Sequence, residues 1–292
     1  MSSHAATHHD HYFVPSPSPL PFALTASLTL FVIGLIQMIE YGQSMPVLFF
    51  VGVGLSLICI YAWFWKIVTE AEGGKYNAQV DMTYRWGMGW FIFSEVMFFG
   101  AFFGALYYAR ALSLPWLSGE GNNLSTHLVL WPGFENTWPS NGPGDIGGSF
   151  QTIPAWDIPF INTLILLTSG VTLTIAHHAL KESQRLKCIL AMWATVALGA
   201  IFLFYQVEEY IHAYQDLNLT LGSGIYGSTF FMLTGFHGAH VTLGTLMLIV
   251  ITLRLMKGHF TPDSHFGFEG VAWYWHFVDV VWLGLFVFVY VV

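Results

Sequence analysis

The stretch WGMGWFIFSEVMFFGAFFGALYY, from Trp86 to Tyr108, decides the fold class of this chain. Nearly all of its residues are apolar, and an apolar run of about 20 residues crosses a bilayer as a helix. The stretch carries one carboxylate, Glu95, in its first half. A carboxylate at that depth costs about 2.5–3.5 kcal/mol on insertion scales. We therefore expect Glu95 to be neutral, partnered or functional.

Two interpretations of Glu95 stay open at the level of sequence. It is either a protonated side chain that bonds within a helix bundle, or a group that handles protons or contacts a partner. Gly100 and Gly104 follow at the spacing that lets helices pack closely, so one face of this helix is expected to meet another helix.

The composition indicates a polytopic membrane protein. Of 292 residues, 55% are hydrophobic, 17% aromatic and only 9% charged, whereas soluble domains carry about 25% charged residues. The net charge is -8 and no basic cluster is present, which excludes a nucleic-acid partner. Cys59 and Cys188 lack a Cys-x-x-Cys spacing, so neither a thiolate metal site nor a disulfide framework is expected.

Residues 1–19 are polar and predict an extended arm in front of the first apolar run. A solvated arm is favoured over metal capture by its histidines, which are His4, His8, His9 and His11. No basic region precedes an apolar core here, so a cleavable signal peptide is not expected.

The chain is predicted to be all-α, with seven transmembrane helices in a single membrane domain covering residues 1–292. The apolar runs that predict these helices are 20–40, 46–67, 84–109, 157–180, 188–212, 226–253 and 271–291. One long connection, 111–156, is rich in Gly, Pro, Asn and Trp, too polar to span, and is predicted to form an outer cap.

The basic residues predict the orientation of these helices. Of the nine Lys and Arg residues, only Arg110 falls at an odd-numbered connection, and the other eight lie at the second, fourth and sixth connections. By the positive-inside rule the N-terminus is cytoplasmic and the C-terminus lies outside.

A lipid site is predicted at the cytoplasmic ends of two helices. Trp63 precedes Glu70 at the end of the second apolar run, where anchoring at the interface alone also explains the tryptophan. Arg254 and Lys257 close the sixth run on the same side of the membrane. Cations at that depth bind anionic headgroups. His240, in the sixth run, is the fifth predicted lipid contact.

Several histidines invite a metal interpretation that their spacing does not favour. His237 and His240 share a helix face, but no H-E-x-x-H motif accompanies them. The adjacent residues His177 and His178 point in different directions around a helix. His276 and Asp279, at i and i+3, are predicted to be a buried polar pair that neutralises itself by hydrogen bonding. Glu208 and His212, at i and i+4 near the outer interface, are explained by a side-chain pair as well as by a metal-ligand set.

These residues lie in motifs that resemble subunit III of haem–copper cytochrome c oxidases. The motif HFGFEGVAWYWHFVDVVWL, starting at His265, is similar to the C-terminal signature of that family. Further similarity is found in YGSTFFMLTGFHGAHVTLG, FIFSEVMFF, LTSGVTLTIAHHAL and VPSPSPLP. The matches follow one order and cover nearly the whole chain, except the 111–156 loop, which is longer than in mitochondrial forms and favours a bacterial type.

The resemblance implies a subunit with no catalytic or metal-binding residues, because haem and copper sit in partner subunits. It implies docking on subunit I, with subunit II in the complex, support of proton uptake, and protection of the oxidase during turnover. It also implies helices 1–2 splayed from helices 3–7 by a cleft that holds phospholipid. Family headgroup contacts match Glu70, Arg254 and Lys257, whereas Thr69 replaces a common Arg. The lipid is therefore expected to be held mainly from the sixth helix.

Two other functions share some of these features. A proton-coupled membrane transporter also carries intramembrane Glu, His and Asp, but usually shows repeated halves with broken helices, which this sequence lacks. A membrane b-type cytochrome needs two facing axial histidines, for which His178, His240 and His276 are the candidates.

Overall fold

A computed structural model describes residues 13–42 and 46–292. The histidines of the N-terminal arm lie outside these residues. The described part is helical and contains no strand, and seven of its helices are long and apolar enough to cross a membrane. This confirms the prediction of an all-α polytopic membrane protein. The elements are α1 (Leu20–Tyr41), α2 (Val47–Glu72), α3 (Ala78–Tyr108), the π-helix η1 (Ala109–Ser113), α4 (Leu114–Leu117), α5 (Leu124–Leu130), α6 (Ile158–Lys181), α7 (Arg185–Gln215), α8 (Gly224–Lys257), α9 (Phe266–Leu285) and the π-helix η2 (Phe286–Val291).

Local sequence signals explain where several of these helices begin and end. Pro21 and Pro159 lie in the first turns of α1 and α6, where a missing N–H removes no helix hydrogen bond. Gly42 follows α1 with a φ of 62° and Gly258 follows α8 with a φ of 83°. This left-handed conformation ends a helix and is cheap only for glycine.

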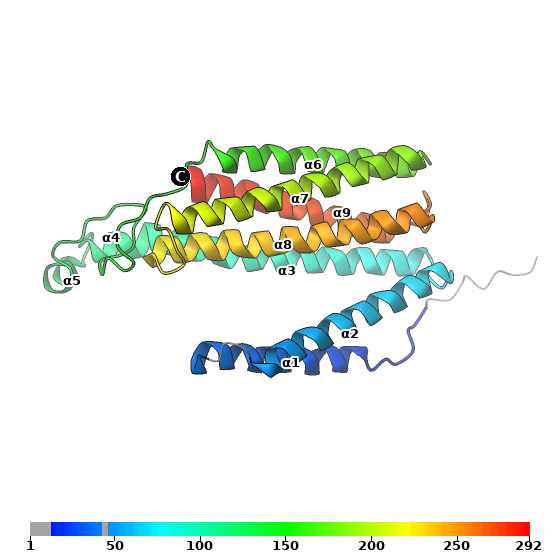
Figure 1. The fold of residues 1–292 in the computed structure, drawn as a ribbon, viewed down its shortest axis with the longest axis horizontal. Coiled ribbons are helices and arrows are strands. Elements are labelled where there is room, and N and C mark those ends of the chain that lie inside the picture. The colour runs from blue at the N-terminus through cyan, green and yellow to red at the C-terminus, as the bar shows by residue number, and fades with distance from the viewer. Residues whose placement is uncertain (1–12, 43–45) are drawn as a thin grey trace, which may run out of the picture. The chain divides into compact units, whose positions relative to one another are not determined.

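The chain forms two compact units, whose boundary lies near the start of α3, between Tyr84 and Arg85. In the first unit α1 and α2 pack side by side (Figure 1). Gly34 and Gly52 lie where the two backbones nearly touch, since a Cβ at Gly34 would come within 2.2 Å of the Phe49 nitrogen. Ser56 donates a hydrogen bond of 3.0 Å to Ser27, and both side chains are buried.

The connection between α2 and α3 is anchored by Tyr76. Its hydroxyl donates to a carboxylate oxygen of Glu70 at 3.0 Å, and its ring packs 5.7 Å from the ring of Phe13 in the N-terminal arm. Lys75 lies over the same Phe13 ring at 5.7 Å. Burial raises the pKa of Tyr76 above its ordinary value. The phenol therefore stays protonated and able to donate at physiological pH.

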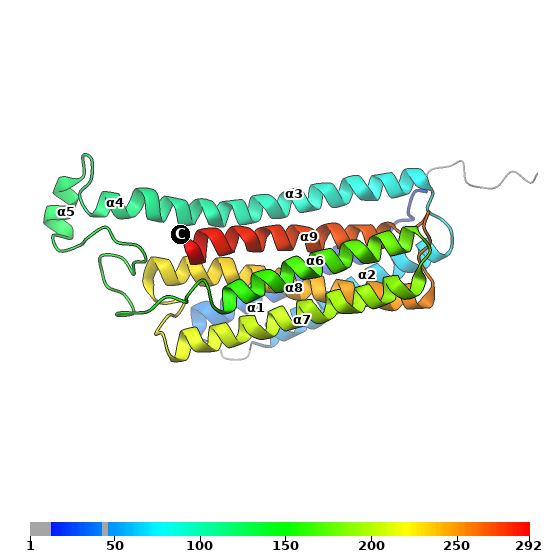
Figure 2. The same cartoon turned by 90° about the horizontal axis from the view of Figure 1, so that it is seen from above.

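The second unit is a bundle in which α9 runs through the middle of its neighbours (Figures 1 and 2). Of the apolar window of α9, 56% is buried, the largest share of any spanning helix. Trp275 and Trp282 are fully buried on it. Their indole nitrogens donate to Ser169 and Thr163 on α6, both at 2.9 Å. Buried aromatic rings whose indole nitrogens are hydrogen-bonded thus join α9 to α6 in the core.

Short connections meet at one end of the bundle, which we call the turn end. The turns between α6 and α7 and between α8 and α9 both lie there (Figure 1). Arg85 donates two hydrogen bonds to Glu269, at 2.9 and 3.0 Å. Arg185 reaches across to the carbonyl of Met256 at 2.6 Å. Arginines thus tie α3 to α9 and α7 to α8 at this end.

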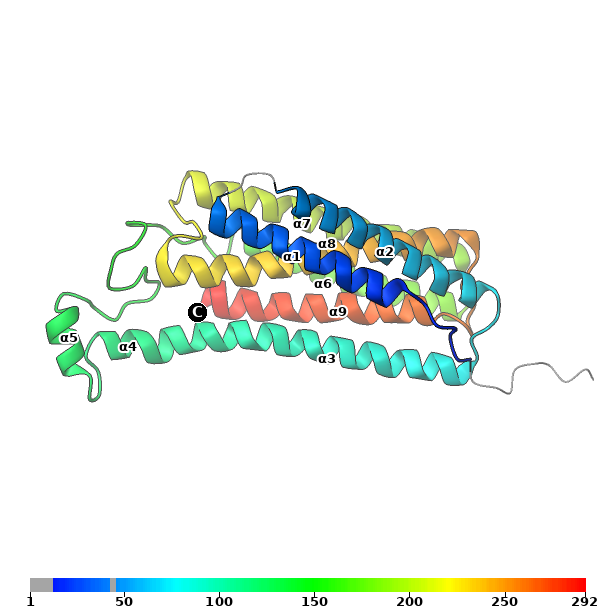
Figure 3. The same cartoon turned by 90° about the horizontal axis from the view of Figure 1, so that it is seen from below.

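At the other end α3 continues through η1 into α4, past residue 111, where the long loop was predicted to begin (Figure 3). The loop contains one further helix, α5. In its later part, Gln151 donates to the carbonyl of Leu217 in the connection between α7 and α8 at 2.9 Å, and Phe150 stacks on Tyr226 in the first turn of α8 at 5.5 Å. This segment therefore covers the end of the bundle.

Candidate functional site

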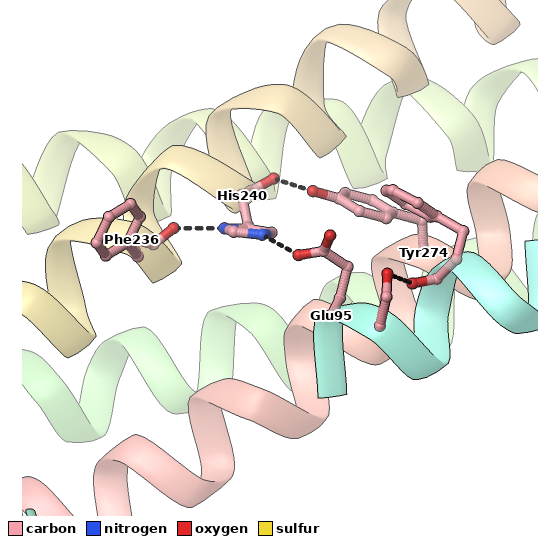
Figure 4. A network of polar contacts seen from close by, with 6 residues as sticks. Glu95, Phe236, His240 and Tyr274 are labelled. Atoms are coloured by element: carbon pink, nitrogen blue, oxygen red, sulfur yellow. Dashed lines mark hydrogen bonds and ion pairs between the residues drawn. The ribbon is translucent and has the colours of Figure 1, made fainter. Parts of the chain in front are cut away.

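The intramembrane carboxylate Glu95 has a partner, and that partner is His240. Glu95 lies on α3 and His240 on α8, and 2.8 Å separates the Oε2 atom of the glutamate from the Nε2 atom of the histidine (Figure 4). The Nδ1 atom of the same ring lies 2.6 Å from the carbonyl oxygen of Phe236, one turn earlier on α8. The side chains of Glu95 and His240 are 21% and 16% exposed, so the pair is mostly enclosed.

The hydrogen bonds of His240 restrict where its protons lie. A carbonyl oxygen can only accept, so Nδ1 must carry a hydrogen toward Phe236. The contact between Nε2 and Oε2 then holds one further proton. This proton sits either on the imidazole, giving an ion pair, or on the carboxyl, giving two neutral groups. Both arrangements have the same net charge. A proton can therefore shift between the two side chains without changing the charge inside the membrane.

Aromatic rings surround the pair. The ring of Phe99 lies 5.0 Å and that of Phe98 5.9 Å from the imidazole of His240, while Tyr274 on α9 stacks on it at 6.4 Å. The Tyr274 hydroxyl also points to the carbonyl oxygen of His240 at 3.5 Å (Figure 4). Apolar walls exclude water, which strengthens a hydrogen bond between polar groups.

We expect Glu95→Gln to change the free energy of unfolding by less than about 1 kcal/mol, because the amide still donates to the unprotonated Nε2 of His240. Glu95→Ala is expected to cost about 1–3 kcal/mol, since it leaves that nitrogen without a partner. Thermal unfolding of the purified chain in detergent compares the two variants. Equal losses in both would show that the negative charge of Glu95, and not its hydrogen bond, holds α3 to α8.

The predicted lipid contacts are divided between the two units. In the first, Trp63 is half-buried on α2 and Glu70 accepts the bond from Tyr76, while the Thr69 hydroxyl bonds back to the carbonyl of Lys66 at 2.8 Å. In the second, Lys257 is exposed at the end of α8. Arg254 lies over the ring of Phe260 at 4.6 Å. Arg254 and Lys257 therefore lie at the turn end of α8. His240, the remaining predicted lipid contact, is bonded to Glu95.

His276 and Asp279 lie on one face of α9, as their spacing predicts, beside Gly170 of α6. A Cβ at Gly170 would lie 3.1 Å from Oδ2 of Asp279 and 3.6 Å from Nδ1 of His276. No hydrogen bond joins these two described residues to each other, and Oδ1 of Asp279 has no hydrogen-bond partner. The pair thus shares a surface but does not neutralise itself there.

The other histidines take separate partners. His237 is fully buried and its Nε2 lies 3.1 Å from the carbonyl of Val278, so it faces α9 while His240 faces α3. His212 bonds to Asp216 at 2.8 Å, and among the described residues no hydrogen bond joins it to Glu208. His177 lies 3.4 Å from His265. Within residues 13–42 and 46–292 no group of three or more His, Cys, Asp or Glu side chains is arranged to hold a metal.

A second buried carboxylate, Glu209 on α7, was not singled out by the sequence pattern as a core residue. Its side chain is fully buried, and its Oε1 accepts a hydrogen bond of 2.5 Å from the hydroxyl of Tyr290 in η2. Tyr290 in turn packs against Phe230 at 5.4 Å. The sequence does contain a signal for such a pair, namely a carboxylate near the end of the fifth apolar run and a tyrosine near the end of the last one.

Tyr290→Phe should lower the free energy of unfolding by about 1–3 kcal/mol, because it leaves a buried carboxyl group without its hydrogen-bond donor. Replacing the carboxyl as well, in Glu209→Leu/Tyr290→Phe, should recover part of that loss. The comparison is made by thermal unfolding, with Tyr107→Phe as the control because Tyr107 is 66% exposed. A loss no greater than that of the control would argue against the pair.

Comparison with known protein families identifies proteins that are similar to this chain. The family model described as "Cytochrome c oxidase subunit III" matches residues 9–121 and 125–292. The chain belongs to the cytochrome c oxidase subunit III family. Named relatives include "Cytochrome c oxidase subunit 3" of Dugong dugon and of Rhinoceros unicornis, each 39% identical over 97% of this chain and 98% of the relative. That of Ceratotherium simum is 40% identical over the same shares.

Membership of the subunit III family confirms the resemblance drawn from the sequence motifs. The seven helices of the described residues that are long and apolar enough to cross a membrane indicate a multi-pass membrane protein. The family makes the chain a subunit of an enzyme complex, cytochrome c oxidase. Respiratory electron transport and the presence of partner subunits follow from the family. The Glu95–His240 pair and the Arg85–Glu269 pair are then features of a subunit III bundle.

Proposed function

We propose that this chain is the non-redox subunit III of a bacterial terminal oxidase that passes electrons from cytochrome c to O2 and pumps protons. It carries no redox centre and performs no catalytic step. It binds the catalytic subunit I, with subunit II in the same complex. The match of the family over nearly the whole chain carries this proposal, and the enclosed Glu95–His240 pair supports a role in handling protons.

The chain supports proton uptake by the complex from the cytoplasmic side. The Glu95–His240 pair supports this role, because a proton can move between Nε2 of His240 and Oε2 of Glu95 without changing the net charge of the pair. The orientation that goes with it places the N-terminus in the cytoplasm and the C-terminus in the periplasm of the plasma membrane. Eight of the nine basic residues at even-numbered connections support that orientation.

We also propose that the chain binds phospholipid. Helices α1 and α2 are proposed to splay from the other five, with the lipid in the cleft between them. Its headgroup would be held by Arg254 and Lys257, with Trp63 and Glu70 from α2 and His240 deeper in the membrane. The exposed ammonium of Lys257 at the end of α8 supports binding of an anionic headgroup.

Neutralising Arg254 and Lys257 together, as Arg254→Gln/Lys257→Gln, is expected to remove most of the anionic lipid that co-purifies with the chain, because headgroup binding depends on these charges. Lipid mass spectrometry of the detergent-purified protein measures the change. The control is Lys75→Gln/Lys181→Gln, which removes two charges from exposed positions. An unchanged lipid content in the first variant contradicts the assignment.

Native mass spectrometry tests the function as a whole. The chain is purified through a tag from a mild detergent extract of its own membranes. A large partner that carries haem and copper is expected to accompany it, and the chain itself should show no Soret band. A chain that runs alone, with oxygen consumption unaltered in its deletion strain, would overturn the proposal and favour the proton-coupled transporter. A Soret band belonging to the chain would favour a b-type cytochrome.

A further inference from the structure

The interface between α7 and α8 contains buried polar groups that lack partners. The two helices lie side by side (Figure 1). Gln206 and Glu209 are about one turn apart on α7, and they are 5% and 0% exposed. Among the described residues, neither polar atom of the Gln206 amide has a hydrogen-bond partner, and nor does Oε2 of Glu209. Three buried polar atoms therefore need partners that the surrounding side chains do not supply.

One direct bond between the two groups would not satisfy them, although they lie close enough to interact. An amide accepts through its oxygen and donates through its nitrogen. A charged Glu209 would accept from the amide nitrogen of Gln206 and leave the amide oxygen without a donor. A neutral Glu209 would donate to that oxygen and leave the nitrogen without an acceptor. Two simultaneous bonds would satisfy both groups, but these two described side chains form neither.

The neighbouring hydroxyl groups have already used their protons. The Thr234 hydroxyl donates to the backbone carbonyl one turn earlier on α8, at 2.7 Å. The Tyr210 hydroxyl lies 2.7 Å from the Thr234 oxygen and must therefore donate to it. Tyr290 donates to Oε1 of Glu209. None of these three hydroxyls has a proton left for the amide oxygen of Gln206.

Glycines leave room opposite these groups. On α8, a Cβ at Gly238 would lie no closer than 4.0 Å to the Gln206 side chain, and a Cβ at Gly235 would lie 3.5 Å from the Tyr210 hydroxyl. The Gln206 side chain thus faces a stretch of helix that carries no side chain. Hydrocarbon cannot satisfy a polar group there. The occupant must be small and able both to donate and to accept a hydrogen bond.

We propose that ordered water molecules are bound between α7 and α8, on the amide of Gln206 and the carboxyl of Glu209. Buried water makes about three hydrogen bonds to polar groups that lack protein partners, and the amide and carboxyl together offer such groups. The carboxyl of Glu209, which the protein otherwise encloses, is then hydrated inside the bundle. This inference does not depend on the proposed function.

Cryo-electron microscopy tests the proposal directly. The protein is purified from its own membranes with whatever subunits accompany it, and a map that resolves ordered water elsewhere in the bundle is used. The expected result is at least one water peak within about 3.2 Å of the Gln206 amide. A map with no water at the amide, including one in which amide and carboxyl form a closed pair with two direct bonds, overturns the proposal.

Thermal unfolding of Gly238→Ala gives a second test. A methyl group at position 238 would meet no protein atom closer than 4.0 Å. In a dry interface it should therefore raise the midpoint, because alanine is a better helix former than glycine. If water fills this space, the methyl group displaces it and the midpoint is expected to fall.

The same substitution in a Gln206→Met background separates displaced water from simple strain. No amide then needs water, so Gly238→Ala is expected to raise the midpoint in that background. Gly100→Ala is the matched control for the helix gain alone, because nothing lies within 4 Å of a Cβ at that position. A change of the same sign in both backgrounds, whether a rise or a fall, overturns the proposal.

Discussion

Leucine at position 52 is expected to break the contact between α1 and α2, because the space that its side chain needs is occupied by backbone. A Cβ at Gly52 would lie 2.3 Å from the nitrogen of Phe31 and 2.9 Å from the carbonyl carbon of Leu30. Overpacking costs about 1–3 kcal/mol where side chains can yield. Backbone atoms cannot yield without moving the whole helix, so we expect a loss at or above the upper end of that range.

A cross-link across the helix pair measures this loss directly. Ser27 and Ser56 are hydrogen-bonded at 3.0 Å, so cysteines at both positions, in a Cys59→Ser background, should form a disulfide in the otherwise unchanged chain. Gly52→Leu is expected to lower the yield at least fivefold. Gly54→Leu is the matched control, because nothing lies within 4 Å of a Cβ at that position. Full cross-linking in the Gly52 variant would contradict the close packing.

Alanine in place of Trp275 is the second change with a large expected effect. Trp275 is fully buried, its ring edge lies 2.7 Å from where a Cβ of Gly199 would be and 2.9 Å from that of Gly244, and its indole donates to Ser169. The ring thus fills slots that two glycines leave open on α7 and α8. Removing a buried tryptophan costs about 3–5 kcal/mol, and helix packing is a main source of stability inside a bilayer.

Thermal unfolding in detergent measures the effect of Trp275→Ala on the purified chain. The control is Trp65→Ala, since Trp65 is 59% exposed near the end of α2. The midpoint of the Trp275 variant is expected to fall far below that of the control. Matching midpoints would show that α9 is held in the bundle by other contacts.

The helices were predictable because each one is a long apolar run, which leaves the chain few alternatives in a membrane. The residues at which these helices begin and end were harder to predict. The run at 84–109 became a span from Ala78 to Leu117, because hydropathy marks only the part that lies in hydrocarbon. A helix continues beyond it wherever backbone hydrogen bonds and packing allow, and here η1 and α4 extend α3.

The polar partners were harder to predict than the helices. Glu95 and His240 are 145 residues apart on different helices, and no local spacing connects them. Glu208 and Glu209 are neighbours, yet only Glu209 is buried. Apolar residues surround both positions, because one side of the helix faces the bundle and the other faces lipid. Without a polar face as a guide, the helix period does not tell which carboxylate points inward.

The continuous span from Ala78 to Leu117 has 40 residues. At a rise of 1.5 Å per residue its axis is about 60 Å long, whereas a bilayer with its headgroups is about 40–45 Å thick. Even a tilt of about 40°, the upper end of the usual range, leaves a vertical height of about 46 Å. This helix is therefore longer than the bilayer is thick throughout the usual range of tilt, so at least one of its ends projects into water, where a water-soluble protein can contact it.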